Sequence, residues 1–241
     1  MKSIFRLIGI LSGAVLATGV AHASVVTFIG GDPGATASTP RPVSNSTAAA
    51  FAIAASALGT INVIDFESVQ VGSFTTLLIA PGVTLTGLNN VGGPQTIRNT
   101  PLPFPENLVG YNTTSGGSHF AQFTAGFMTF TFATPISAFA AFFTGVELPG
   151  ETITFSDGTT QTIGLLNLGL GVGGVEFVGF TDAGRLISSI TINVSPATDG
   201  IAIDDVRFVS PRVTTVVPEP SVALLVGLGA LALTISRKRK Q

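Results

Sequence analysis

The sequence contains no cysteine and no tryptophan, and its 241 residues include only two histidines and one tyrosine. The absence of cysteine excludes disulfide bonds, thiol catalysis and zinc sites built from thiolates. Phenylalanine is abundant instead, with 18 residues. Because a phenyl ring fills a core without needing a polar partner, we expect most of these rings to lie inside a folded domain.

Positive charge is scarce between the two ends of the chain. From Ser24 to Val217 there is no lysine, and five arginines face twelve acidic residues, which gives this span a net charge of −7. Nucleic acids and anionic lipids bind basic surfaces, so neither is an expected partner of this span. Roughly 190 residues can bury one core, which favours a single domain.

The first 23 residues have the pattern of a cleavable signal peptide. Two basic residues precede an uncharged apolar run from Leu7 to Val20, and Ala21-His22-Ala23 matches a small-residue cleavage site. We therefore place the cut after Ala23. A retained membrane anchor is the alternative, although the run is shorter than the ~20 residues that a span needs.

Three features follow one another at the C-terminal end. The motif Val217-Pro218-Glu219-Pro220 precedes an uncharged apolar stretch from Val222 to Ile235, and a basic cluster closes the sequence with Arg237, Lys238, Arg239 and Lys240. As a helix, residues 221–236 would reach about 24 Å, which can span a bilayer if the flanking basic side chains snorkel. The four cations favour the cytoplasmic side, so the chain before the motif should lie outside.

This trio resembles the PEP-CTERM sorting domain of Gram-negative bacteria, over about the last 25 residues. The resemblance implies recognition by an exosortase, cleavage near Pro218-Glu219-Pro220, and delivery to the cell envelope, the cell surface or the extracellular matrix. An ordinary C-terminal membrane anchor is the alternative. It would change the processing but not the side of the membrane.

The middle of the chain predicts an all-β domain. Short runs rich in β-branched residues and phenylalanine alternate between apolar and polar positions and are separated by Gly, Pro, Asn and Asp. The predicted strands are Ile61–Glu67, Gly82–Leu88, Phe120–Thr124, Phe127–Phe132, Ile136–Phe143, Glu151–Phe155, Thr160–Leu165, Val175–Phe180, Leu186–Val194 and Ile201–Val209. Such a series favours one antiparallel β-sandwich of jelly-roll type over residues 61–210.

The remaining segments are predicted to be connections. Residues 24–60 should form a loose leader with one short helix, Ser46–Leu58, and residues 211–217 should link the sandwich to the sorting signal. Asp157-Gly158 has the sequence of a tight hairpin turn. The segment Asn89 to Asn107, rich in Gly and Pro, is predicted to be a long loop that either binds a ligand or covers a sheet edge.

No residue is assigned a catalytic role. His119, the only histidine after the signal peptide, follows Ser115-Gly116-Gly117-Ser118, and no nucleophile-elbow sequence such as G-x-S-x-G occurs. His119 is therefore expected to cap a loop or the start of a strand. A glycosidase would need two carboxylates across a sugar, and the number of acidic residues alone does not indicate such a pair.

Two acidic segments predict a metal site. Asp65-Phe66-Glu67 and the segment from Gly200 to Val206 resemble the first and last strands of MAM-type and related carbohydrate-binding jelly rolls, without the MAM cysteines and with few rings for stacking on sugars. Because side chains alternate along a strand, either Asp204 or Asp205 must face apolar neighbours. A buried carboxylate needs a cation, backbone N–H donors or an arginine such as Arg207.

We therefore predict a structural Ca²⁺ site formed by Asp65, Glu67, Asp204 and Asp205, where the first and last strands meet. The alternative is that these acids are solvated at strand ends or are bonded to backbone amides.

Together, these patterns predict an exported, noncatalytic protein of the cell envelope or the biofilm matrix, with an envelope or matrix polysaccharide as a candidate partner. The alternative is a glycan-binding module that uses the Asn89–Asn107 loop and Tyr111. A hydrolase ranks third.

Overall fold

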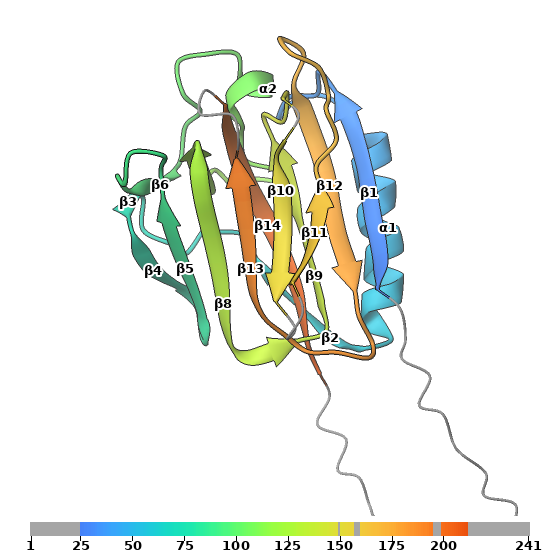
Figure 1. The fold of residues 1–241 in the computed structure, drawn as a ribbon. Helices are drawn as coiled ribbons and strands as arrows, with labels where there is room; N and C mark the ends of the chain where they lie inside the picture. The colour runs from blue at the N-terminus through green and yellow to red at the C-terminus, as the bar shows by residue number, and fades with distance from the viewer. Residues whose placement is uncertain (1–24, 149, 157–159, 195–198, 212–241) are drawn as a thin grey trace, which may run out of the picture.

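The computed structural model describes residues 25–148, 150–156, 160–194 and 199–211. Within them, two antiparallel sheets pack face to face, so the predicted all-β sandwich is confirmed (Figure 1). One sheet has the order β1-β12-β9-β14-β7-β6-β3, with β2 also paired to β14, and the other has the order β11-β10-β13-β8-β5-β4.

The strands and helices have the following bounds: β1 Val26–Pro33, α1 Pro42–Ser56, β2 Gly59–Ile64, β3 Gly72–Phe74, β4 Thr76–Ala80, β5 Val83–Leu88, β6 Gln95–Arg98, α2 Glu106–Val109, β7 Phe120–Thr124, β8 Gly126–Ile136, β9 Ala138–Thr144, β10 Thr152–Ser156, β11 Thr160–Gly164, β12 Gly174–Thr181, β13 Ile187–Val194 and β14 Gly200–Pro211.

Phenylalanine fills the space between the two sheets, as expected from its abundance. Phe139, Phe155 and Phe180 are almost fully buried there. The rings of Phe155 and Phe180 are stacked with centroids 4.0 Å apart, and these two residues come from opposite sheets. Burial of such large apolar side chains is the main stabilising contribution to a sandwich.

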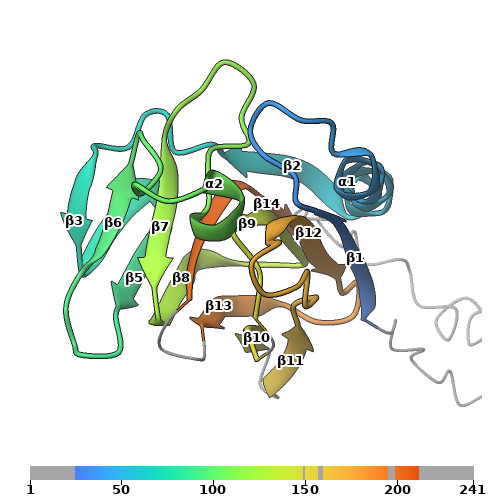
Figure 2. The same ribbon diagram turned by 90° about the horizontal axis from the view of Figure 1, so that it is seen from above.

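A second apolar layer lies outside the larger sheet, where α1 covers β1 and β12 (Figure 2). Phe51 of α1 packs against Phe28 and Phe177, with ring centroids 5.6 and 5.7 Å apart. The predicted helix is confirmed, but it begins at Pro42, four residues before the predicted start. Proline suits the first turn of a helix because its missing N–H would be unpaired there in any case.

The N-terminus of α1 is capped from a neighbouring strand. Asp32 of β1 accepts hydrogen bonds from the amides of Val43 and Ser44, at 3.0 and 2.8 Å, and from the Ser44 hydroxyl at 2.7 Å. Burial alone would raise the pKa of Asp32, but these donors and the nearby Arg41 lower it below its usual value. Asp32 therefore holds the helix against the sheet.

The prediction of a loose leader over residues 24–60 is wrong. Strand β1 pairs with β12 along its whole length, from Val26 opposite Thr181 to Pro33 opposite Gly174. Its two glycines obscure the strand pattern in the sequence. Gly30 is needed for close packing, because a Cβ atom there would collide with the Thr47 side chain of α1.

All ten predicted strands are present, with ends shifted by a few residues. The sequence analysis missed β1, β3, β4, β6 and α2, and the predicted Asn89–Asn107 loop contains β6 and the first residues of α2. Strands β10 and β11 pair as a hairpin, Ser156 opposite Thr160, whereas the Asp157-Gly158 turn lies outside the described residues.

The predicted signal peptide and the sorting signal also lie outside the described residues. Pro211, placed in the linker by the sequence analysis, is the last residue of β14. Neither helix in the described part of the chain has the length and apolar character required to cross a membrane.

Candidate functional site

The candidate site lies where β14 exchanges one neighbour for another. Along one edge, β14 pairs with β7 over residues 200–203 and with β2 over residues 206–211. Asp204 and Asp205 occupy the gap between these pairings. The register with β9 shifts between Asp204 and Arg207, and Asp205 has a φ angle of 47°. A β-bulge of this kind redirects side chains.

A β-bulge interrupts the regular alternation of side chains that the sequence predicts for β14. Regular alternation would place Asp204 on the same face as Val206 and Phe208. In the structure, Val206 and Phe208 belong to the core between the sheets, whereas Asp204 bonds to the loop that follows α2, on the outer face. Arg207 also faces outward, and its guanidinium lies over the rings of Phe142 and Phe177.

Asp204 is fully buried and is satisfied by hydrogen-bond donors. Its Oδ2 accepts from the amides of Thr113 and Thr114, at 2.6 and 3.1 Å, and from the Thr113 hydroxyl at 3.1 Å. Its Oδ1 accepts from the Asp205 amide at 2.8 Å. Burial and the neighbouring Asp205 charge raise the pKa of Asp204 to about 7, although the three amides oppose this shift.

Asp205, which is half-buried, bonds to the same loop. Its Oδ1 accepts from the Thr114 hydroxyl at 2.9 Å, and its Oδ2 accepts from the Thr113 hydroxyl at 3.0 Å. The two aspartates together therefore fix Thr113 and Thr114 against β14.

Glu67, just beyond β2, fixes the other end of this loop. Its Oε1 accepts from the amides of Ser118 and His119, both at 2.8 Å, and from the Asn112 side chain at 3.0 Å. A Cβ atom at Gly117 would collide with this carboxylate, so the loop requires glycine there. Three carboxylates, two from β14 and one from the turn after β2, thus organise residues 112–119, which we call the clamp loop.

His119, the last residue of the clamp loop, also bonds to the turn after β2. Its Nδ1 lies 3.2 Å from the Phe66 carbonyl oxygen and 3.0 Å from that of Val69, which fits an Nδ1–H that donates to them. Phe66 has a φ angle of 59°, and Asp65 accepts from the Glu67 amide at 3.1 Å. These contacts form the turn that ends β2 three residues before the predicted Glu67.

The four predicted calcium ligands lie along this junction. In the described part of the chain, however, no three Asp, Glu or His side chains come together as a group that could hold a metal ion. Amide and hydroxyl donors compensate Asp204, Asp205 and Glu67, which matches the alternative of acids bonded to the backbone. The Ca²⁺ site stays a prediction.

Calcium binding by the folded state would raise the melting temperature by several degrees in millimolar calcium relative to EGTA, because binding to the native state alone stabilises it. The difference should shrink in Asp205→Ala and Glu67→Ala. Identical melts of the wild-type protein in the two buffers would contradict the predicted site.

A polar pocket of about 350 Å³ opens beside the clamp loop. Its lining residues are Ala37, Arg41, Asn112, Thr113, Thr114, Ser115, Gly116 and Gly117. Arg41 also donates from Nη2 to the Thr113 carbonyl oxygen at 3.1 Å. The lining is more polar than apolar, and none of these residues carries an aromatic ring that could stack on a ligand.

A second acidic group lies at the same end of the sandwich as α2 and was missed by the sequence analysis. Glu151, Glu176 and Asp199 are at most 3% exposed. Both carboxyl oxygens of Glu176 accept from the Leu166 amide at 3.0 Å, and burial raises its pKa to about 8. The position of Glu176 within the apolar run of β12 was a sequence signal for a buried acid.

Glu151 and Asp199 form a carboxyl pair. Among the described residues, no N–H or hydroxyl group donates to either oxygen of Glu151, and its hydrogen-bonding contact is with the Asp199 carboxyl group. Burial, the hydrogen bond to Asp199 and the charges of Asp199, Glu176 and Glu147 together raise the pKa of Glu151 to about 10. Two carboxyl groups can hydrogen-bond only if one is protonated, so Glu151 holds a proton at neutral pH.

Tyr111 cannot have the sugar-stacking role that the glycan-binding alternative gave it. It is 1% exposed, and its hydroxyl donates to the Ala35 carbonyl oxygen at 3.0 Å. The ring packs in the apolar layer beneath α1.

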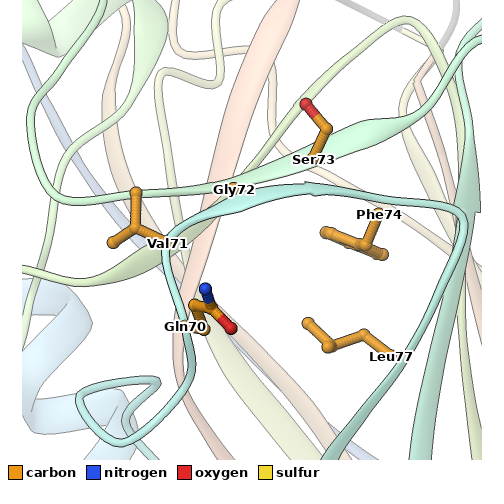
Figure 3. Close-up of a pocket in the computed structure, with 6 residues that line it drawn as sticks. All are labelled: Gln70, Val71, Gly72, Ser73, Phe74 and Leu77. Atoms are coloured by element: carbon orange, nitrogen blue, oxygen red, sulfur yellow. The ribbon is translucent and has the colours of Figure 1, made fainter.

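Two further hollows differ in character. One, of about 220 Å³, lies beside β3 and is lined by Gln70, Val71, Gly72, Ser73, Phe74 and Leu77, without a charged side chain (Figure 3). The other, also about 220 Å³, lies at α2 and is lined by Phe104, Leu108, Val109, Glu147, Asp199 and Gly200. The second combines an exposed ring with the carboxyl groups of Glu147 and Asp199.

No protein-family model matches the chain, and comparison with curated proteins gives no match. Among solved structures, the carbohydrate-binding module TmCBM61 in complex with β-1,4-galactotriose is similar over 53% of this chain and 88% of its own, with 12% identity and a TM-score of 0.34. The catalytic domain of a GH87 α-1,3-glucanase in complex with nigerose is similar over 68% of this chain and 30% of its own, with 13% identity and a TM-score of 0.34. Similarity this distant carries no functional argument.

Proposed function

We propose that this chain is an exported, noncatalytic component of the cell envelope or the extracellular matrix, sorted through its C-terminal PEP-CTERM signal. The observation that carries the proposal is the order of three features in the sequence: the Val217-Pro218-Glu219-Pro220 motif, the apolar stretch and the terminal basic cluster. An exosortase is the processing partner that this order implies.

The contacts of the clamp loop support a noncatalytic role. The carboxylates of Glu67, Asp204 and Asp205 bind loop amides and hydroxyls, and His119 Nδ1 lies against two backbone carbonyls. A general base or nucleophile must instead be directed at a substrate. These groups are engaged in holding the fold.

Intact mass spectrometry of the protein released by the native host tests the sorting proposal. We expect a chain that begins at Ser24 and ends near the Pro218-Glu219-Pro220 motif. A Pro218→Ala, Pro220→Ala double variant should accumulate unprocessed, whereas the control Thr214→Ala, Thr215→Ala should be processed normally. Released protein that still contains peptides from Leu224 to Ile235 would contradict sorting by cleavage.

Glycan binding is the second candidate function, favoured by one observation. Phe104, within the segment that the sequence singled out as a possible binding loop, is 67% exposed and lines the hollow at α2. An exposed ring beside carboxylate acceptors provides an apolar face together with hydrogen-bonding groups, which is the combination that small-ligand sites use.

A further inference from the structure

The hollow at α2 is held in place by close backbone contacts. Gly110, at the end of α2, approaches β14 so closely that a Cβ atom there would overlap Ala202. The Asn107 side chain donates to the Val172 carbonyl oxygen at 2.8 Å, which ties α2 to the loop before β12. Figure 2 shows α2 lying across this end of the sandwich, over β14 and β9. The hollow is therefore held in place by the contacts of α2 with β14 and with the loop before β12.

One side of the hollow is apolar and accessible. Phe104 is exposed, and Leu108 and Val109 of α2 are half-buried next to it. An exposed aromatic ring presents a flat face against which the C–H groups of a sugar can pack. The volume of about 220 Å³ is below the ~300 Å³ at which pockets for drug-sized ligands begin, and so suits a single sugar ring.

The opposite side carries acceptors. Glu147 is half-buried, and its Oε2 accepts from the Gly171 amide at 3.2 Å. Asp199 is 3% exposed, and its Oδ1 accepts from the Gly200 amide at 2.8 Å, whereas no N–H or hydroxyl group of the described residues donates to its Oδ2. Glu151 is in hydrogen-bonding contact with Asp199. A carboxylate has about four lone-pair sites, so Asp199 can accept from a ligand hydroxyl as well as from Gly200 and Glu151.

We infer that this hollow binds one residue of a neutral, hydroxyl-rich glycan, with Phe104 as the platform and the carboxylates of Glu147 and Asp199 as acceptors for sugar hydroxyls. The inference specifies the site of the glycan-binding function proposed above and does not depend on sorting. Anionic ligands are disfavoured because the carboxylates of Glu147 and Asp199 line the hollow. Glu151 is a positioning residue that acts through Asp199.

Calorimetric titration of the purified full chain with cellotriose, xylotriose, maltotriose and trigalacturonic acid tests the site. We expect at least one neutral trisaccharide to bind, with a dissociation constant of about 1 mM. Trigalacturonic acid should bind at least about tenfold more weakly because its charge opposes that of the site. Phe104→Ala should weaken the neutral interaction about tenfold or more.

The matched control is Val91→Ala, which alters another exposed apolar side chain of the same segment, 84% exposed in the structure. It should leave the affinity unchanged. Asp199→Asn should weaken binding, and its melting curve reports whether it folds; Phe104 is too exposed for its removal to unfold the domain. The inference would be overturned if no neutral probe bound at 10 mM, or if Phe104→Ala bound the sugar with the affinity of the wild type. It would also be overturned if the site bound calcium chloride alone and Asp199→Asn removed that binding. None of these outcomes bears on the C-terminal mass that tests sorting.

Discussion

Replacing Asp204 with alanine is expected to lower the free energy of unfolding by about 4 kcal/mol. The variant leaves the buried amide of Thr113 and the partly buried amides of Thr114 and Asp205 without their acceptor. Each unpaired buried donor costs about 1–3 kcal/mol, and a group that accepts several of them has a larger effect than an ordinary hydrogen bond. The clamp loop should separate from β14 because Asp204 is its principal attachment.

Urea denaturation followed by circular dichroism measures this effect. The control is Asp205→Asn, since asparagine tolerates the positive φ angle at this position and keeps an oxygen that accepts from the Thr114 hydroxyl. It should change stability by less than about 1 kcal/mol. If Asp204→Ala were no less stable than Asp205→Asn, the carboxylate would not be the attachment of the loop.

Raising the pH from about 5 to about 8.5 is expected to destabilise the protein. Burial raises the pKa of Glu151 to about 10, that of Glu176 to about 8 and that of Asp204 to about 7. Between the unfolded and folded pKa values, the folded state holds protons that the unfolded state releases. The stabilising contribution of these three carboxyl groups is therefore complete below their pKa values in the unfolded state. It is lost as the pH rises toward their pKa values in the folded state. Asp32, whose pKa is lowered, acts oppositely and only at more acidic pH.

Glu151→Gln should reverse much of this loss. Glutamine keeps the shape and a donor toward Asp199 but cannot ionise, so the variant should be more stable than wild type by about 2 kcal/mol or more at pH 8.5 and similar to it at pH 5. Chemical denaturation across this pH range provides the measurement. Glu106→Gln changes an acid outside the buried acidic group, and its free energy of unfolding should vary with pH as in the wild type. If the free energy of unfolding varied with pH in the same way in Glu151→Gln and in the wild type, Glu151 would not titrate as inferred.

The buried acids show where prediction from sequence succeeds and where it fails. Asp204 and Asp205 were recognisable because two adjacent carboxylates in an apolar strand require compensation wherever they lie. Their donors, Thr113 and Thr114, lie about 90 residues away in the sequence, at separations of 91 and 90 positions from Asp204. No local pattern links a loop amide to a strand that distant, so the sequence left a cation, backbone amides and an arginine open as compensation for these carboxylates.

Local periodicity determined by itself that this chain is an antiparallel sandwich with ten recognisable strands and an Ala-rich helix, because alternation and turn residues act over a few positions. The termini likewise predicted export and sorting from contiguous signals. The tertiary structure decided that β1 belongs to the sheet, that a bulge turns Asp204 toward the clamp loop, that Tyr111 is buried, and that Phe104 and Asp199 line one hollow. These features depend on contacts between distant segments, whose free energy comes from burial and from long-range hydrogen bonds that the order of residues does not encode locally.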